Sequence, residues 1–425
     1  MIQYYNNNRG IKIANTKSLY ITVFKIIIRF WKKITFENNS GRYIMKKVSR
    51  RSFIKTGSVV GSVMTAGGMK PRSIYAAEDG ANIRYRDLGS TGFRVGEVGF
   101  GAMNMRDPEL VHAAIDSGIN YIDTAYKYMN GENERVVGQV MRTKRDKVFL
   151  TTKLPETDIK DFPKMIETSL KRLNTDHVDL LLAHGLHEVE WLENEDLIKP
   201  LVDAKRKGQA RFIGYSTHQF PADYLDATLR SEVWEAVLMS YNYLSPPEVT
   251  GHIKKAREAG KAIIAMKTQM QGDGNPDASS DSVSSHQAAL KWVLDNPYVD
   301  VAIPGMTSFE HLTEDLAVMK MKLSSTDSRE LHRFAGDLKG TYCSGVLGCT
   351  GCADKCPNGV NVSEINRCLG YAYGYGDTRL AYENYYDLAS SSRIEKCSDC
   401  DDCAVTCVNG LNLTENVRHA EKMFG

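Results

Sequence analysis

Residues 120–153 read NYIDTAYKYMNGENERVVGQVMRTKRDKVFLTTK, and this stretch decides the fold. Its short apolar runs at Asn120–Thr124 and Val148–Lys153 predict two β-strands. Between them, Asn133–Arg142 has apolar residues at helical spacing. A strand, a helix and a second strand in this order predict two parallel strands joined by a crossover helix.

The same unit repeats along residues 83–322, after an expected hairpin at Tyr85–Val95. Strands are expected at Glu97–Ala102, Asn120–Thr124, Val148–Lys153, Val178–His184, Arg211–Ser216, Ala236–Tyr241, Ala262–Lys267 and Val299–Pro304. Helices are expected at Pro108–Ser117, Asn133–Arg142, Lys160–Leu173, Ile198–Lys207, Ala222–Arg230, Pro247–Ala259, Ser282–Asn296 and Ser308–Met319. Eight units over roughly 240 residues predict an α/β fold, a (β/α)8 barrel of the TIM type. A doubly wound open sheet is the alternative, but no Gly-rich phosphate turn follows the first strand.

Polar side chains of four different kinds stand at successive strand ends. Asp123 lies at the end of the second strand with Tyr128 just after it, Lys153 ends the third, and His184 ends the fourth. A single lysine or histidine in such a place is ordinary, because lysines are solvated and histidines are often satisfied inside a core. In a barrel of this type the chemistry lies at the C-terminal ends of the strands. The four residues together therefore predict an active site.

Further short motifs accompany these residues. They are Asp123-Thr-Ala with Tyr128, Gly131-x-x-Glu134, Thr152-Lys153, Asp179-Leu-Leu-x-x-His184, Gly214-x-Ser216, Tyr241-Asn242 and Ile303-Pro304-Gly305. From Ile83 to Met321 the chain thereby resembles the aldo/keto reductase family. The resemblance implies an oxidoreductase that uses NADP or NAD to reduce a carbonyl or oxidise an alcohol.

The resemblance also implies a role for each residue of the proposed site. Tyr128 exchanges a proton with the carbonyl oxygen, although a phenol with a pKa near 10 is a poor acid or base at neutral pH. Lys153 is expected to lower that pKa, and Asp123 to fix the lysine. His184 is expected to hydrogen-bond the carbonyl oxygen and orient it.

On the cofactor side, the resemblance implies contacts from several strand ends. The residues are Gly101, Met103, Ser216, Lys267, Gly305, Thr307, Glu314 and Asp315. The chain departs from the family pattern at Thr217, Leu238 and Met266, where Asn, Gln and a stacking Tyr are usual. His311 stands where many relatives place an arginine on the 2′-phosphate, so both NADP and NAD stay open.

All nine cysteines lie in the last fifth of the chain, from Cys343 onward. Two linked runs follow the bacterial ferredoxin spacing, in which the fourth cysteine of each run binds the other cluster. The second run is complete, whereas the first has Val346 in place of its leading cysteine, and Cys343 is the expected substitute. Two [4Fe-4S] clusters are therefore predicted. One would be held by Cys397, Cys400, Cys403 and Cys356, and the other by Cys349, Cys352, Cys407 and Cys343.

Disulfides and zinc are the alternatives for these cysteines. Cys368 is left over and is expected to be a buried or spare thiol. Helical spacing across Leu369–Leu388 predicts a small α-helical, ferredoxin-like domain at residues 341–425. Residues 323–340 are expected to form a linker helix.

Residues 45–80 resemble a twin-arginine export signal, with Arg50-Arg51, then Phe53 and a weakly apolar stretch. A basic amphipathic helix is the alternative. The signal implies recognition by the twin-arginine translocase and a periplasmic location, with membrane anchoring if the leader is retained. Residues 1–44 are expected to be a mis-assigned start or a disordered extension, with Met45 as the true first residue.

Composition narrows the possible partners. The chain has 425 residues, 42% of them hydrophobic and 25% charged, as in soluble globular proteins. Residues 1–75 hold 15 of the 54 Lys and Arg but only one of the 52 Asp and Glu, so the remainder is acidic. An acidic body gives no case for nucleic-acid binding. The expected partners are a small carbonyl or hydroxyl substrate, sugar-like among the options, and a redox partner protein.

Two functions from different classes remain at this point. The first is an exported oxidoreductase whose barrel is coupled to the two clusters. The second is a cluster-based electron-transfer protein on a catalytically disused barrel. The intact set of Asp123, Tyr128, Lys153 and His184 favours the first. His187, close to His184, is interpreted as a surface residue in a polar loop.

Overall fold

The computed structural model describes residues 35–37, 43–45, 83–218, 221–269, 283–338, 343, 349, 351–352, 355–374, 377–397, 400 and 403–425. The chain divides into two compact units, residues 1–73 and 74–425. In the first unit, β1 (Thr35–Glu37) pairs antiparallel with β2 (Tyr43–Met45). The paired arginines of the leader lie outside the described residues, so the export signal stays a prediction.

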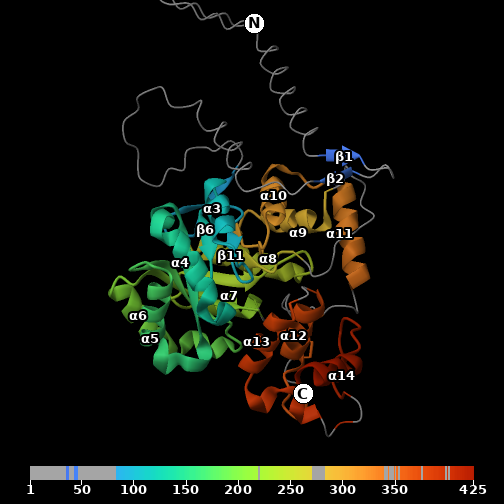
Figure 1. Ribbon diagram of the computed structural model, residues 1–425. Helices are drawn as coiled ribbons and strands as arrows, with labels where there is room; N and C mark the ends of the chain where they lie inside the picture. The colour runs from blue at the N-terminus through green and yellow to red at the C-terminus, as the bar shows by residue number, and fades with distance from the viewer. Residues whose placement is uncertain are drawn as a thin grey trace, which may run out of the picture. The chain divides into compact units, whose positions relative to one another are not determined.

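The second unit is built on one eight-stranded parallel sheet (Figure 1). Its strands are β5 (Phe100–Gly101), β6 (Tyr121–Asp123), β7 (Phe149–Pro155), β8 (Val178–His184), β9 (Ala210–Thr217), β10 (Ala236–Ser240), β11 (Ala262–Met266) and β12 (Val301–Ala302). Each strand pairs with its neighbours in chain order. Two parallel bridges, Val98 with Ala302 and Gly101 with Gly305, join the two edges of the curled sheet. The parallel sheet predicted from the sequence is confirmed, with every strand at its expected place.

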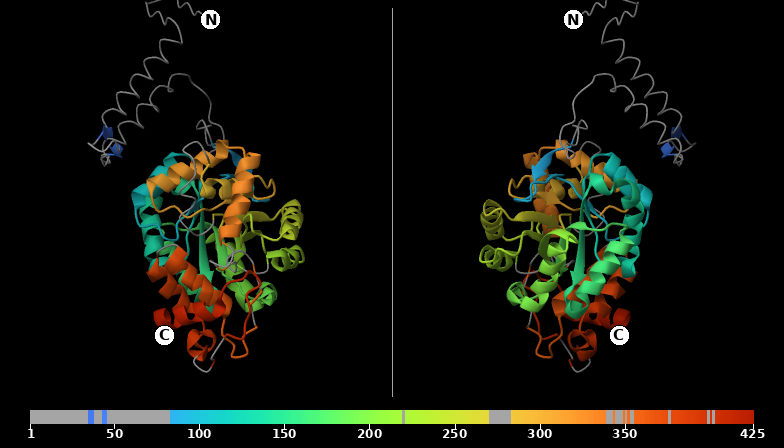
Figure 2. Two further views of the ribbon diagram at one scale, coloured as in Figure 1. Left: turned by 90° about the vertical axis from the view of Figure 1, so that its right-hand side faces the viewer. Right: turned by 90° about the vertical axis from the view of Figure 1, so that its left-hand side faces the viewer.

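Helices follow the strands and cover the outside of the sheet (Figure 2). They are α3 (Pro108–Asp116), α4 (Glu132–Lys144), α5 (Phe162–Arg172), α6 (Glu195–Arg206), α7 (Pro221–Leu229), α8 (Pro247–Glu258), α9 (Ser285–Leu294) and α10 (Phe309–Ala317). Each begins within three residues of its predicted start. The alternation of strands and helices therefore gives the right order of elements and nearly the right boundaries.

Along each strand, alternate side chains belong to two different hydrophobic layers. On β8, Leu180 and Leu182 pack inside the curled sheet, whereas Leu181 and Ala183 pack against the helices. The side chains alternate because successive residues of a strand point to opposite faces. The hairpin of β3 (Tyr85–Asp87) and β4 (Arg94–Gly96) adds Leu88 and Val95 to the inner layer. One end of the barrel is thereby plugged, which leaves the other end for a pocket.

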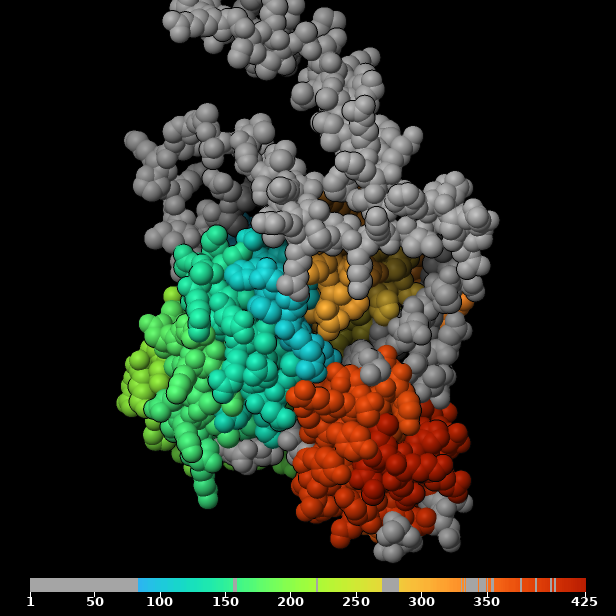
Figure 3. Space-filling view, viewed as in Figure 1, coloured from blue at the N-terminus to red at the C-terminus, as the bar shows by residue number. Residues whose placement is uncertain are grey.

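The C-terminal part of the second unit is helical. It contains α11 (Ser325–Leu338), α12 (Val362–Gly374), α13 (Thr378–Asp387) and α14 (Leu413–Phe424). Its own core includes Cys368, Leu369 and Ile394, with the rings of Tyr385 and Phe424 stacked at 4.3 Å between centroids. Figure 3 shows this part, in orange and red, against the barrel. Within the described ranges, no helix is both long and apolar enough to cross a membrane.

Two helical glycines provide a matched test of this packing. A Cβ on Gly138 of α4 would lie 2.1 Å from the carbonyl oxygen of Arg172, whereas one on Gly251 of α8 would meet no atom within 4 Å. We expect Gly138→Ala to lower the free energy of unfolding by about 1–3 kcal/mol, because the added methyl overpacks the α4–α5 contact. Gly251→Ala should raise it by up to about 1 kcal/mol, because alanine is the better helix former. Urea unfolding measures both, and equal effects of the two changes would contradict this packing.

Candidate active site

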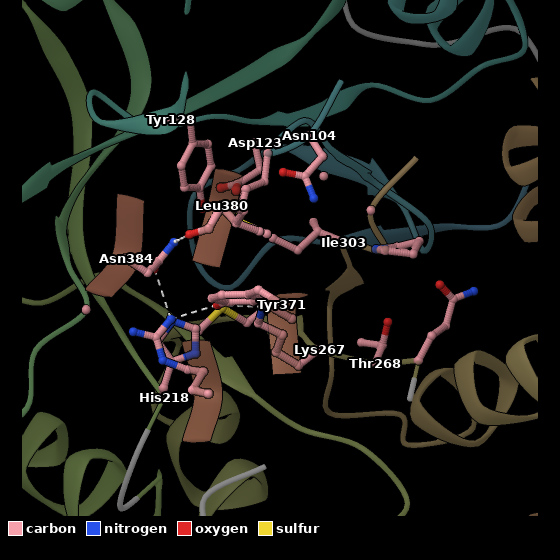
Figure 4. Close-up of a pocket in the computed structure, with 18 of the residues that line it drawn as sticks. Asn104, Asp123, Tyr128, His218, Lys267, Thr268, Ile303, Tyr371, Leu380 and Asn384 are labelled. Atoms are coloured by element: carbon pink, nitrogen blue, oxygen red, sulfur yellow. Dashed lines mark hydrogen bonds between the residues drawn. The ribbon is translucent and has the colours of Figure 1, made fainter. Parts of the chain in front are cut away.

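A cavity of about 690 Å³ lies at the C-terminal ends of the strands. This volume is in the range of small-molecule sites. Ten of the twelve residues predicted for catalysis and cofactor binding line it: Gly101, Met103, Asp123, Tyr128, His184, Lys267, Gly305, Thr307, Glu314 and Asp315. The other two, Lys153 and Ser216, are buried directly behind residues of the lining. The structure therefore brings the predicted set together in one place, and Figure 4 labels Asp123, Tyr128 and Lys267 in this cavity.

A buried ion pair organises the catalytic candidates. Lys153, at 1% exposure, donates from Nζ to Asp123 Oδ1 at 2.5 Å and to the Thr124 carbonyl at 2.8 Å. The same ammonium donates to the Tyr128 hydroxyl at 3.3 Å. The His184 ring stands edge-on to the Tyr128 ring, with 5.6 Å between centroids. An ammonium, a carboxylate, a phenol and an imidazole thus form one contiguous group.

The loop that carries Tyr128 is held by buried polar contacts. After Tyr128, Met129 and Asn130 have φ of 52° and 54°. These left-handed conformations cost energy in residues other than glycine, so the surrounding contacts must maintain them. The buried side chain of Asn133 donates to the Ala102 carbonyl at 2.6 Å and accepts from the Thr124 hydroxyl at 2.6 Å. The loop is therefore tied to the ends of both β5 and β6.

Glu134 of the Gly-x-x-Glu motif has a comparable positioning role. Its fully buried carboxylate accepts from the Thr152 hydroxyl at 2.7 Å and from Arg172 at 3.2 Å. Arg172 also donates to the Tyr126 carbonyl at 3.1 Å. This network joins α4, α5 and β7 behind the loop that carries Tyr128.

Burial sets the protonation of the two groups that face the cavity. It raises the pKa of Tyr128, and the nearby Lys153 only partly opposes that rise. Lys153 does lower the pKa of Tyr128, as expected, but the net shift is upward because the cost of burying a phenolate exceeds the attraction of the ammonium. Burial also lowers the pKa of His184 well below its usual value, with further lowering from Lys153. At neutral pH the site presents a protonated phenol and a neutral imidazole.

Within the buried pair, burial raises the pKa of Asp123, and Lys153 opposes that rise. Burial alone would lower the pKa of Lys153, but Asp123 and Tyr128 attract its charge and raise it. The ammonium is therefore charged at neutral pH. It is a positive charge beside the Tyr128 oxygen.

The departures from the family pattern have structural explanations on the cofactor side. Ser216 accepts from the Gly185 backbone at 2.9 Å, and Thr217 donates to the Leu186 carbonyl at 3.0 Å. Leu238 is buried inside the barrel, and Met266 lines the cavity. The hydroxyl of Thr217 is therefore committed to the backbone rather than offered to a ligand.

The far end of the cavity holds a polar group that sequence reasoning missed. Thr268 is 1% exposed and lines the cavity, yet within the described part of the chain its hydroxyl has no hydrogen-bond partner. Nearby, Gln269 donates to Asp315 at 2.5 Å, and burial raises the pKa of Asp315 to about 8. An orphaned hydroxyl and a carboxyl that is mostly protonated at neutral pH, both on the cavity wall, fit the polar groups of a nucleotide.

The helical tail supplies a wall of the same cavity, which the sequence did not reveal. Glu364, Arg367 and Tyr371 of α12 and Asn384 of α13 all line it. The barrel adds His218 and His187. The surface interpretation of His187 is wrong, because the residue is half-buried at the cavity and burial lowers its pKa. In the sequence, the only local signal for these tail residues was that their helix carries polar and aromatic side chains.

Eight of the nine cysteines fall into two groups. Cys343, Cys349, Cys352 and Cys407 line one small pocket. Burial, followed by the charges of Cys349 and Cys407, raises the pKa of Cys352 to about 11. In the other group, burial and then Cys356, Cys400 and Cys403 raise the pKa of Cys397 to about 11.

These groups have the same membership as the two predicted ligand sets. Asn409 donates to Cys349 and Cys407, both at 3.4 Å, and Asn358 donates to Cys400 at 3.2 Å. Among the residues that the structure describes, no three His, Cys, Asp or Glu side chains form a group that could hold a single metal ion. Cys368 is fully buried in the tail core, as expected for the ninth thiol.

The curled parallel sheet, with its polar cavity at the strand ends, has the layout of barrel enzymes, whose chemistry lies at that end. The aldo/keto reductase family profile matches residues 96–273 and 277–335, which is more than half of the chain. The chain belongs to this family of NAD(P)-linked oxidoreductases.

Individual relatives agree with this assignment. The chain is 27% identical to the aldo-keto reductase AMT2 of Alternaria alternata over 351 residues, which cover 61% of the chain and 94% of that protein. It is 27% identical to the methylglyoxal reductase YeaE of Escherichia coli over 240 residues, covering 51% and 80%. A solved aldo-keto reductase from Klebsiella pneumoniae in complex with NADPH superposes with a TM-score of 0.51 at 24% identity, covering 60% and 94%. This last likeness shows the fold.

Proposed function

We propose that the protein reduces a small carbonyl compound, or oxidises the corresponding alcohol, with NADP or NAD. The observation that carries this proposal is the contact of the buried Lys153 ammonium with both Asp123 and Tyr128 beside His184. A bound nicotinamide supplies or accepts the hydride. The substrate is a small aldehyde, ketone or sugar-like hydroxyl compound, because the cavity is lined by several polar side chains.

The chain's own residues handle the proton. Tyr128 is protonated at neutral pH, so it donates its proton to a carbonyl oxygen that gains negative charge during reduction. Lys153 stabilises the phenolate that remains. The neutral His184 ring can donate a hydrogen bond to the same carbonyl oxygen and fix its direction. In alcohol oxidation Tyr128 accepts the proton instead, so that direction is favoured by higher pH.

Residues at the opposite end of the cavity fit the remainder of the nucleotide. Gly305 and Thr307 precede α10, whose Ser308 N-cap accepts from the His311 backbone at 3.3 Å. A helix N-terminus favours phosphate oxygens. The Thr268 hydroxyl, Glu314 and Asp315 add polar partners around it. With Gly101, Met103, Ser216 and Lys267, these residues form the proposed nucleotide site.

Tyr128→Phe tests the assignment of the proton donor. The change removes one oxygen, so we expect carbonyl turnover to fall by about 10²–10⁴-fold while nucleotide binding stays intact. NADPH oxidation measures turnover, and nucleotide fluorescence measures binding. Tyr298→Phe is the matched control. The Tyr298 ring lies under Lys254 and away from the cavity, so this variant should turn over normally. Unchanged turnover in Tyr128→Phe discards the assignment.

We also propose that the tail binds two [4Fe-4S] clusters through the two groups of four thiols. Iron-sulfur clusters of this type take four cysteine thiolates each, and the spacing of the runs follows the ferredoxin pattern. The clusters supply one-electron transfer, which would connect the barrel to a redox partner protein. Asn409 and Asn358 donate to three of the sulfurs, and such hydrogen bonds stabilise thiolate charge.

The iron content of two variants separates this proposal from a structural role for the thiols. Cys397→Ser removes one ligand, so we expect the anaerobically purified protein to lose about four of eight iron atoms per chain and part of its visible absorption. Cys368→Ala changes a buried thiol outside both groups and should keep the full iron content. Equal iron loss in both variants, or no iron in the parent protein, contradicts the proposal.

A second candidate function keeps the clusters and discards the barrel chemistry. The observation that favours it is the altered cofactor side, where Thr217, Leu238 and Met266 replace the usual residues. In that case the protein transfers electrons through the tail alone. Normal turnover in the parent protein, lost in Tyr128→Phe, excludes this candidate.

We further propose export by the twin-arginine route to the periplasm. The Arg50-Arg51 pair supports it, and this route carries folded proteins whose clusters were inserted beforehand. Replacing both arginines by lysine should leave the full-length protein in the cytoplasm, because the pair is what the translocase recognises. Cell fractionation with antibody detection measures this. Lys46→Arg is the control and should be exported, and export of the double-lysine variant contradicts the proposal.

A further inference from the structure

The rim of the cavity carries a second imidazole that the proposed function does not use. His218 follows directly after β9, is half-buried and lines the cavity. Figure 4 shows it on the side of the cavity away from Tyr128. The residue before it, Thr217, has its hydroxyl bonded to the Leu186 carbonyl. At this strand end, His218 is therefore the side chain that is turned to the cavity.

One nitrogen of the His218 ring is held from the sheet. Its Nδ1 lies 3.4 Å from the hydroxyl oxygen of Ser240, within hydrogen-bond distance. Ser240 ends β10 and is only 2% exposed. The other ring nitrogen, Nε2, has no hydrogen-bond partner within the described part of the chain, and it is not sealed inside the protein. The ring therefore presents one open nitrogen to the cavity.

The charged neighbour of this ring is already bonded to the tail. Arg367 forms a buried ion pair with Glu364, and it donates to Tyr371 at 2.7 Å and to Asn384 at 3.1 Å. Burial, followed by the charge of Arg367, lowers the pKa of His218 well below its usual value. The imidazole is neutral at neutral pH, so its open nitrogen can donate or accept a hydrogen bond. Such a nitrogen suits an uncharged oxygen better than an ion.

The register of the sheet sets the separation of the two imidazoles on the rim. β8 and β9 are adjacent, and Ala183 lies opposite Tyr215. The next residues, His184 and Ser216, therefore face each other at the strand ends, and His218 lies two residues farther along. A strand spacing of about 4.8 Å and a rise of about 3.3 Å per residue put the two histidine backbones about 8 Å apart. A small substrate with a hydrogen bond at each end spans such a distance.

We propose that His218 is a specificity-determining residue, which binds a hydroxyl oxygen of the substrate at the end away from the reacting carbonyl. The proposal rests on the proposed function, because Tyr128 and His184 hold the carbonyl at the other end. It assigns to the protein a preference for hydroxylated carbonyl compounds over alkyl compounds of the same size. Ser240 is a positioning residue, because it acts through the ring.

The preference has a simple physical origin. A substrate that enters the cavity removes water from the open nitrogen of His218. A hydroxyl group replaces the lost hydrogen bond, whereas a methyl group leaves the nitrogen without a partner. The difference is a property of the pair of substrates and does not depend on how fast the protein reduces either of them.

Three pairs of ketones test the proposal on the full-length protein, each pair differing by a hydroxyl in place of a methyl group. They are hydroxyacetone and butan-2-one, 4-hydroxybutan-2-one and pentan-2-one, and 5-hydroxypentan-2-one and hexan-2-one. NADPH oxidation gives kcat/KM for each ketone. In at least one pair we expect the parent protein to prefer the hydroxylated ketone by about 3–10-fold, the effect of one neutral hydrogen bond. His218→Phe keeps a ring but removes both nitrogens, so it should bring that ratio close to one.

Two further variants and a control accompany His218→Phe. Ser240→Ala removes the hydroxyl that holds the ring, so the ratio should fall part of the way. His218→Gln keeps a hydrogen-bonding group and should restore part of the ratio lost in the phenylalanine variant. His252→Phe is the matched control. The His252 ring bonds to Asp226 and does not line the cavity, so the parental ratio should be kept.

The ratio separates this role from two others. A purely structural role for His218 would lower kcat/KM for both members of each pair alike. Contact of His218 with the nicotinamide would raise the KM for NADPH equally with both members. Either result overturns the proposal, as does a parent protein without a preference in any pair, or a ratio that is lost in His252→Phe.

The two proposals fail separately. Ketone reduction that is lost in Tyr128→Phe, with an unchanged ratio in His218→Phe, keeps the reductase function and removes the role of His218. A parent protein that reduces none of the six ketones contradicts both.

Discussion

The buried ammonium of Lys153 is the interaction on which the site depends. A charge taken out of water is costly unless it is paired and hydrogen-bonded, and Asp123, the Thr124 carbonyl and Tyr128 supply those partners. The pair can form because β6 and β7 are adjacent parallel strands, with Asp123 opposite Thr151 in register. A shift of one residue would turn Lys153 to the other face of the sheet. The register of the barrel strands therefore also fixes the geometry of the catalytic residues.

Much of this arrangement was predictable from the sequence, for a definite reason. Strand residues such as Leu180–Ala183 alternate between two apolar environments, and helices recur between them, so local patterns report the order of elements. Asp123, Tyr128, Lys153 and His184 could be grouped because parallel strands present their ends on one rim. The eight cysteines could be divided into two groups because the ferredoxin-type spacing itself indicates which cysteines belong together.

The rest of the site depends on burial by segments that are far apart in the sequence, and no local pattern predicts such burial. Lys267 and Tyr371 are 104 positions apart in the chain, yet their side chains bond. The raised pKa of Tyr128 comes from the depth of the cavity rather than from its neighbour in sequence. His187 looked like a loop residue because nothing in its own segment shows that the cavity extends to it. Each of these features required knowledge of what packs on the rim.

The helix α12 belongs to two parts of the molecule at once. One set of its side chains closes the cavity, and another, including Cys368 and Leu369, packs in the tail core. It lies in the chain between Cys356 and Cys397, which fall in the same group of thiols. Protein interiors are close-packed, so a helix held on both sides cannot adjust to one without the other. A change that displaces the tail core would therefore also displace the side chains with which α12 closes the cavity.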